Sequence, residues 1–228
     1  MRYNLISRPS DPKIVGMKNG ESQGWIIPKK YNKYSDYQEM YDFFVNSYWD
    51  KSDFNPPKIF NIEYVKLNKK AKLTDIFYIA PSFIGCDIAI NSKVFGLISN
   101  LELRNSFFFP INLYDHSGLK INDTFYLVYT KMIGYEYIDF SNSTFFTGSE
   151  ILGKRYIGIK DEQHFLNVLN ENALIKAEKI KLNDRFEHMD YFTTRLGGPF
   201  ISEKLLDRFN DFEISGFKLS NRKEIVNE

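Results

Sequence analysis

The sequence predicts an α+β fold, in which helices pack on a mixed, mainly antiparallel sheet. Three observations lead to this prediction. Strand-like and helix-like segments follow one another without the regular spacing of β–α–β units, which argues against a doubly wound parallel sheet. Hydrophobic residues make up 43% of the 228 residues, which suits one large domain or two small lobes that share a core. One segment occurs twice, which adds the hypothesis of two related lobes.

The first third of the chain predicts loops and one clear helix. Gly, Pro, Asn and Ser are frequent near the N-terminus, which indicates loops with one or two short strands. A helix is predicted over 35–49, with Ser35 and Gln38 as a candidate capping box at its start. Its apolar stripe has helical spacing and consists of Tyr37, Met40, Tyr41, Phe43, Phe44 and Tyr48. Pro56-Pro57 then ends helical structure.

The remainder of the chain is rich in β-prone segments. They are apolar or alternating runs between turn residues, and they span 59–67, 74–80, 107–113, 125–130, 135–140, 177–182 and 191–196. A second helix is predicted over 161–169. Gly197-Gly198-Pro199 is interpreted as a break in the chain before the last helix, because glycine and proline interrupt regular structure.

The repeated segment is the most informative pattern. Residues 90–107 and 201–218 align at an offset of 111 residues, with apolar residues at matching positions. Each copy has the pattern of a short amphipathic helix that leads into an extended stretch. Asn91 and Ser202 stand where an N-cap side chain would accept a hydrogen bond from the first backbone amides. Neither copy carries reactive residues, so the repeat predicts scaffold elements.

Two regions are predicted along the chain. Residues 1–71 form an N-terminal region with one amphipathic helix, and residues 72–228 form a second, larger domain. No linker stands out by composition. If the larger domain consists of two lobes, we expect them to join near 147–153.

Charge and cysteine content restrict the partners and the compartment. Lys and Arg number 30 against 29 Asp and Glu, so no basic excess predicts nucleic-acid binding, and the four lysines of 66–72 are interpreted as a solvated edge. The single Cys86 excludes an internal disulfide, fits a reducing compartment and is expected to be buried. The N-terminus lacks the apolar run of a signal peptide, and no stretch is apolar enough to cross a membrane. We therefore predict a cytoplasmic protein without membrane contact.

No pattern in the sequence predicts catalysis, a metal or a cofactor. His116, His164 and His188 are scattered, without a Cys or His partner at zinc-ligand spacing. His116 follows Asp115, but neighbours in a turn rarely orient one another as members of a triad. Phosphate-binding glycine loops and the GxSxG nucleophile pattern are missing from the sequence. The sequence thus favours a binding protein over an enzyme.

Several short motifs lie between Lys72 and the C-terminus, about two-thirds of the chain. They are Lys72 with Asp75, Ser92-Lys93, Phe107 to Pro110, Phe125-Tyr126-Leu127, Ile138-Asp139 with Ser141 or Ser143, Ile201-Ser202-Glu203-Lys204 and Gly216-Phe217. With these motifs the chain resembles a bacterial immunity-protein family of polymorphic toxin systems, the Imm-eleven type, formerly a domain of unknown function. A structural role is the alternative for Asp75, Pro110 and Asp139, which could fix turns and strand ends.

The resemblance implies a non-enzymatic protein that binds and neutralises a cognate secreted toxin by occluding its active surface. It implies no active site. Our candidate partner-binding residues are the acidic edge of the 35–49 helix, namely Asp36, Glu39, Asp42 and Asp50, because acidic rims speed association with basic partners. An ordinary solvated helix face is the alternative for this edge. Two other functions remain open: an enzyme with a site of scattered carboxylates and a histidine, and a structural component of a phage or secretion system.

Overall fold

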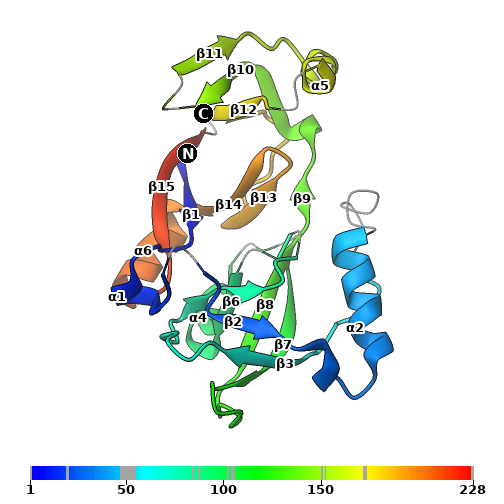
Figure 1. Cartoon of the computed structure of the whole chain (residues 1–228). Helices are drawn as coiled ribbons and strands as arrows, with labels where there is room; N and C mark the ends of the chain where they lie inside the picture. Colours follow the sequence, from blue (N-terminus) through cyan, green and yellow to red (C-terminus); the bar gives the residue numbers. More distant parts are fainter. Residues whose placement is uncertain are drawn as a thin grey trace.

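The protein consists of two β-sheets with helices packed against them (Figure 1). Figure 1 shows a computed structural model, which describes residues 2–226 apart from 19–20, 47–54, 84, 87, 102, 104–105, 150, 152 and 172–173. Most strand pairs in this described part are antiparallel, and four are parallel. The prediction of an α+β fold with a mixed, mainly antiparallel sheet is therefore confirmed.

The eight-stranded sheet, sheet A, occupies the upper part of Figure 1. Its strands are β1 (Arg2–Ser7), β9 (Met132–Ile133), β10 (Ile138–Ser149), β11 (Gly153–Ile157), β12 (Lys176–Leu182), β13 (Tyr191–Thr194), β14 (Gly197–Ser202) and β15 (Lys218–Val226). They lie in the order β11-β10-β12-β15-β1-β14-β13-β9. The N-terminal strand β1 is thus an inner strand, paired with β14 on one side and β15 on the other.

The seven-stranded sheet, sheet B, lies below sheet A in Figure 1. Its strands are β2 (Gly24–Ile26), β3 (Ile62–Leu67), β4 (Ile76–Phe77), β5 (Ile79–Ala80), β6 (Ile88–Asn91), β7 (Ser106–Tyr114) and β8 (Phe125–Thr130). They lie in the order β4-β6-β8-β7-β3-β2-β5. Strands predicted over 59–67, 107–113 and 125–130 correspond to β3, β7 and β8, so their alternating or apolar patterns were informative.

The helices are short, and several of them pack against the sheets. The described α-helices are α1 (Pro12–Val15), α2 (Tyr34–Tyr41), α4 (Ser92–Ile98), α5 (Glu162–Glu171) and α6 (Glu203–Asp211). Single 3-10 turns occupy Pro28–Lys30 and Tyr135–Tyr137, and a π-helical turn, Asp42–Asn46, continues α2. In Figure 1, α2 flanks sheet B, whereas α5 lies beside β10 and β12.

Three hydrophobic clusters hold these layers together. One lies between sheet B and α2 and centres on fully buried rings such as Phe44, Phe109 and Tyr129. A second belongs to sheet A and α5 and includes Phe165 and Phe192. The third contains residues of both sheets together with α4 and α6. Because this third cluster joins the sheets, it marks no boundary between lobes, and the two-lobed arrangement stays a prediction.

The repeated segment has the predicted local structure in both copies. A strand ends at an N-cap residue, a short helix follows, and the chain returns as a long strand: β6–α4–β7 and β14–α6–β15. Asn91 Oδ1 accepts a hydrogen bond from Val94 N at 3.1 Å, and Ser202 Oγ accepts one from Leu205 N at 3.1 Å. Both predicted N-caps are confirmed. The two helices also touch, since Arg208 Nη1 donates to the Leu97 carbonyl at 3.1 Å.

Two local predictions were wrong. Helix α2 begins at Tyr34 after the N-cap position Lys33, so Ser35 and Gln38 do not form a capping box. Within the described residues no side chain caps the first turn, and buried Tyr31 packs edge-on against Tyr37 of this helix at 5.4 Å between ring centroids. The 47–49 end of that predicted helix lies outside the described residues.

Gly197-Gly198-Pro199 is not a break but the start of β14, which forms a hairpin with β13. The side chain of Thr194 holds the turn, because its Oγ accepts from Leu196 N and donates to the Gly197 carbonyl, each at 3.0 Å. A Cβ on Gly198 would approach Thr193 Oγ1 to 2.9 Å, so this glycine serves close packing of the hairpin.

The domain boundaries at 71 and near 147–153 stay predictions. Strand pairing shows, however, that β1 and β2 lie in sheets built mainly from residues beyond 71. The segment near 147–153 contains the end of β10 and the start of β11, which pair with each other as a hairpin.

Candidate functional site

The predicted acidic edge lies on α2 and the π-helical turn that follows. Glu39 and Asp42 are exposed and Asp36 is partly buried, whereas Asp50 lies outside the described residues. Glu39 is already paired, because Lys58 Nζ donates to its Oε2 at 2.6 Å, and this hydrogen bond raises the pKa of Lys58. Such an exposed pair adds little to stability. Of the four predicted residues, Glu39 and Asp42 are therefore exposed on α2 and its π-helical continuation, and their role in partner binding stays a prediction.

A rigid base supports the acidic edge. Phe44 is fully buried, and its ring stacks on Phe83 at 5.5 Å and meets Tyr129 edge-on at 5.3 Å. Met40 is also buried in the same cluster. Since the apolar side of α2 and its π-helical turn is fixed in this way, the acidic side is presented without a large ordering cost on binding.

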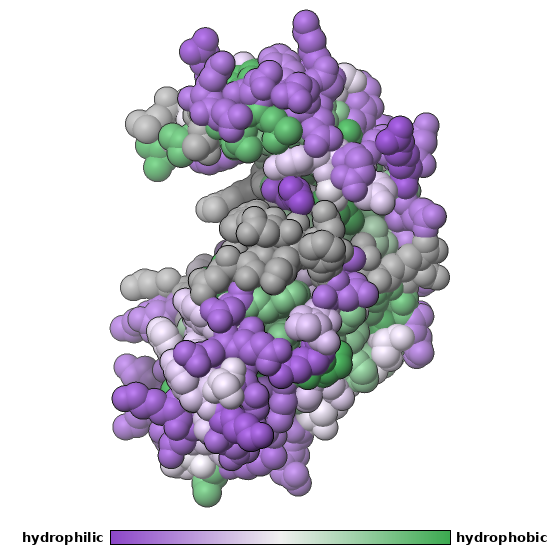
Figure 2. All heavy atoms as spheres, turned by 90° about the vertical axis from the view of Figure 1, so that its right-hand side faces the viewer, coloured by the Kyte–Doolittle hydropathy of each residue, from purple (hydrophilic) through white to green (hydrophobic). Residues whose placement is uncertain are grey.

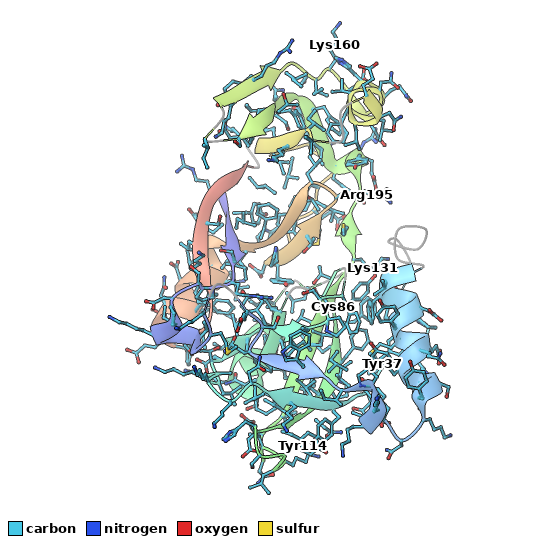
Figure 3. All side chains as sticks on the ribbon, in the orientation of Figure 1. Tyr37, Cys86, Tyr114, Lys131, Lys160 and Arg195 are labelled. Atoms are coloured by element: carbon cyan, nitrogen blue, oxygen red, sulfur yellow. The ribbon has the colours of Figure 1, made fainter. Side chains whose placement is uncertain are left out.

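A second acidic surface was not predicted. It is a cleft of about 470 Å³ between the start of α5, the 3-10 turn at Tyr135–Tyr137, the start of β10 and the loop after β12. Five carboxylates and two cations line it: Glu136, Asp139, Asp161, Glu162 and Asp184 with Lys160 and Arg185. We call it the acidic cleft. Figure 3 places Lys160 beside α5, at the end of the molecule farthest from Tyr114.

Two of the cleft carboxylates organise the backbone around it. Asp139 accepts hydrogen bonds from Asn142 and Ser141, which lower its pKa although slight burial opposes the shift. Asp161 accepts from the backbone amide of His164 at 2.8 Å and so covers the first turn of α5. Both carboxylates are therefore held in place by hydrogen bonds to neighbouring residues.

The other three carboxylates point to partner binding. Within the part of the chain that the structure describes, Glu136, Glu162 and Asp184 are exposed, and their carboxylates have no ion pair. Burial, together with the nearby charge of Glu162, raises the pKa of Tyr135, so this phenol stays neutral at the cleft wall. The arrangement attracts cationic groups. It offers no nucleophile beside a base.

Sequence reasoning missed the acidic cleft because its residues come from three distant segments, 135–140, 160–162 and 183–185. The available signals were the neighbouring acids Asp161-Glu162 and the motif residue Asp139, and neither indicates which other segment lies beside it. Figure 2 shows a hollow between the upper and lower parts of the molecule, with hydrophobic residues along much of its upper rim and hydrophilic residues over the outer ends of the molecule.

Two of the three histidines have no catalytic geometry. His116 is exposed, and its neighbour Asp115 instead accepts from Ser117, Gly118 and Leu119, which closes a turn. His164 lies in the first turn of α5, where its Nδ1 accepts from the Lys160 amide at 3.3 Å. Asp115 and His116 therefore do not form part of a triad.

His188 belongs to a polar chain. The hydroxyl of Tyr3 lies 3.0 Å from His188 Nδ1, and His188 Nε2 lies 3.4 Å from Oδ1 of the fully buried Asp190. Burial and the charge of Asp190 raise the pKa of Tyr3 to about 12. Ser202 donates to the same Oδ1 at 2.6 Å, so the carboxylate also holds the N-cap of α6.

Asp75 has the matching role in the first copy of the repeat. Its Oδ1 accepts from Asn91 Nδ2 at 2.9 Å, and its Oδ2 accepts from Ser215 Oγ at 2.6 Å and Ser215 N at 2.9 Å. Partial burial opposes ionisation, but these hydrogen bonds and Lys93 together lower the pKa of Asp75. Asp75, Asp139 and Asp190 thus have structural roles. For the motif residues Asp75 and Asp139, this agrees with the structural alternative that the sequence left open.

Comparison with known proteins assigns the chain to no family. No family model matches the chain, and no curated protein matches it. Among the described residues, no group of three or more His, Cys, Asp or Glu side chains could hold a metal ion. The described helices include none with the length and apolar character needed to cross a bilayer.

Proposed function

We propose that this protein is a non-enzymatic immunity protein that acts in the cytoplasm and neutralises a cognate secreted toxin by occluding its active surface. The observation that carries the proposal is the acidic cleft, which has five carboxylates against two cations and whose exposed Glu136, Glu162 and Asp184 form no ion pair within the described residues. The motif resemblance is the second support, although the motif residues Asp75 and Ser202 themselves serve the scaffold.

The acidic cleft suits a basic protein surface. Its volume of about 470 Å³ accommodates one or two long cationic side chains, and its charge complements them. A specific complex buries on the order of 1,600 Å² in total, with most of the binding energy in a few anchors. The cleft is therefore the anchor point of a larger contact, in which Lys or Arg of the toxin pairs with Glu162 and Asp184.

The acidic edge of α2 is the second candidate contact. Asp42 and Glu39 are exposed there, but Lys58 already offsets the charge of Glu39. We therefore expect charge changes on α2 to alter mainly the association rate, whereas changes in the cleft alter the dissociation rate.

If a secreted toxin is encoded beside this gene, co-expression with that toxin tests the proposal. The wild-type protein should restore growth, and the double variant Glu162→Lys, Asp184→Lys should fail to do so although it remains folded. Asp207→Lys, an exposed acid on α6, is the matched control and should protect fully. Failure of the wild-type protein to protect or to bind the toxin would reject the immunity function. Protection by all variants would reject only the assignment of the acidic cleft as the toxin-binding site.

An enzyme is the second candidate, and the Tyr3–His188–Asp190 chain favours it, because a histidine between a phenol and a buried carboxylate can relay protons. Tyr3 and Asp190 are buried, however, and Asp190 also holds the N-cap Ser202. If His188→Gln abolished protection while the protein stayed folded and still bound the toxin, the enzyme function would replace the proposal.

A further inference from the structure

The outward side of sheet B carries a row of aromatic and basic side chains. Trp25 of β2 is the register partner of Lys66 of β3, and Lys66 is the partner of Tyr114 of β7. Register partners on neighbouring strands lie side by side on the same face of a sheet. The row therefore crosses three strands. Figure 3 shows Tyr114 at the bottom of the sheet, far below Lys131 and Lys160.

The row faces away from the core. Side chains alternate between the two faces of a strand. Ile26, Val65 and Leu113, which flank the three row residues in sequence, are all buried in the cluster beneath α2. Trp25 is half exposed, at 50% of its full accessibility. Large exposed indoles on a sheet face are uncommon, because their burial would normally stabilise the fold.

Two further side chains extend the row. Tyr64 lies two residues before Lys66 on the same strand, and its ring stacks on Tyr114 with 3.9 Å between centroids and 17° between planes. The ammonium of Lys30 lies 5.9 Å from the Tyr64 ring centroid. We call Trp25, Lys30, Tyr64, Lys66 and Tyr114 the aromatic face.

The aromatic face is locally basic. Within the described residues neither Lys30 nor Lys66 has an ion pair. Lys66 begins the four-lysine run, which continues as exposed Lys69 and Lys70 in the turn after β3. The nearby carboxylate of Asp115 remains charged, but it is engaged by the donors of its own turn. The chain carries a formal charge of only +1, yet Lys30 and Lys66 lie beside the rings and Lys69 and Lys70 follow in the next turn.

We propose that the aromatic face binds single-stranded nucleic acid. Bases stack on exposed aromatic rings irrespective of their sequence, and lysines beside the rings contact the phosphates. Trp25 and Tyr114 lie on either side of Lys66 on strands about 5 Å apart. Trp25 is exposed and offers the stacking surface, whereas Tyr114 and Tyr64 are partly buried and stack on each other. An acidic protein segment would use the lysines but gain little from the rings. This site is independent of the toxin-binding function.

Fluorescence anisotropy with a labelled deoxythymidine oligonucleotide of about 15 nucleotides tests the site on the full chain. We expect saturable binding that weakens with salt and partly quenches tryptophan fluorescence. Trp25→Ala should weaken binding about tenfold and remove the quenching, because it deletes a stacking ring. Lys66→Gln should lower the slope of log affinity against log salt by about 0.7. Phe212→Ala, a half-exposed aromatic on α6, and Lys33→Gln should bind as the wild type does.

The outcomes separate the proposal from its competitors. Absence of saturable binding at low salt would overturn it. Equal affinity for duplex and single-stranded DNA, or unchanged binding by Trp25→Ala, would show that the lysines attract polyanions without base stacking. Either result would also overturn the proposal. If polyglutamate bound with the same dependence on Trp25, an acidic protein segment would be the better occupant. Oligonucleotide binding that needs both Trp25 and Lys66 and prefers single strands supports the assignment.

Discussion

Replacement of Asp75 by alanine is expected to destabilise the protein strongly, because this carboxylate joins two segments 140 residues apart. It accepts three side-chain or backbone hydrogen bonds, from Asn91 Nδ2, Ser215 Oγ and Ser215 N. Hydrogen bonds to a charged group contribute about 1.5–3 kcal/mol each when buried. Asp75 is only partly buried, so water replaces part of this energy. We therefore expect Asp75→Ala to lose about 3 kcal/mol in total.

Urea denaturation at neutral pH measures this loss, and thermal unfolding should show a midpoint lowered by about 6–12 °C for a domain of this size. A double-mutant cycle with Ser215→Ala isolates the Asp75–Ser215 pair, for which we expect a coupling of about 1 kcal/mol or more. Asp75→Asn is the matched control for charge, since it keeps the shape and one acceptor oxygen.

The pH dependence gives an independent check. The pKa of Asp75 is lowered in the folded state below its usual 3.8, so its contribution is complete above that value. The contribution is then lost as pH falls through the folded pKa. The stability difference between wild type and Asp75→Asn should accordingly shrink in acid. A loss below about 0.5 kcal/mol for Asp75→Ala, or a wild-type advantage over Asp75→Asn that grows in acid, would refute the reasoning.

Three further substitutions test the scaffold by urea or thermal unfolding. Gly216→Ala should destabilise by more than about 2 kcal/mol, because the residue has φ +95° and a Cβ would meet the Ile76 carbonyl oxygen; a neutral result would contradict that geometry. Phe44→Ala should cost about 3–5 kcal/mol, since it empties the centre of the cluster under α2, and a loss below about 1 kcal/mol would show that the site collapses. Ser202→Ala should cost more than the usual cap loss of about 1 kcal/mol, because buried Asp190 also loses this hydrogen bond; the comparison is Asp11→Ala at the exposed N-cap of α1, and equal losses would argue against the Asp190 bond.

Local patterns in the sequence were enough to place many elements. The apolar run 125–130 is β8, and the doubled segment contains α4 and α6 behind their caps Asn91 and Ser202. These features depend on neighbouring residues, because a cap needs only the next amides and an amphipathic helix needs only its own spacing. The α+β class followed from the same local information.

Contacts between distant residues were beyond local patterns. Arg208 of α6 donates to the Leu97 carbonyl 111 residues earlier, and the N-terminal strand β1 lies between β14 and β15. No pattern near residue 75 indicates that Ser215 will bond to Asp75. Such pairings are decided by which strands become neighbours, and strand order is a property of the whole chain.

The same division holds for function. By itself the sequence determined the fold class, the capped repeat helices and the lack of a catalytic motif. Only the tertiary structure assigned the motif carboxylates to the scaffold, collected the acidic cleft from three distant segments and aligned Trp25, Lys66 and Tyr114 on one sheet face. The physical reason is that caps and helical faces are formed by neighbours in sequence, whereas clefts and sheet rows require the strand order and register that only the complete fold sets.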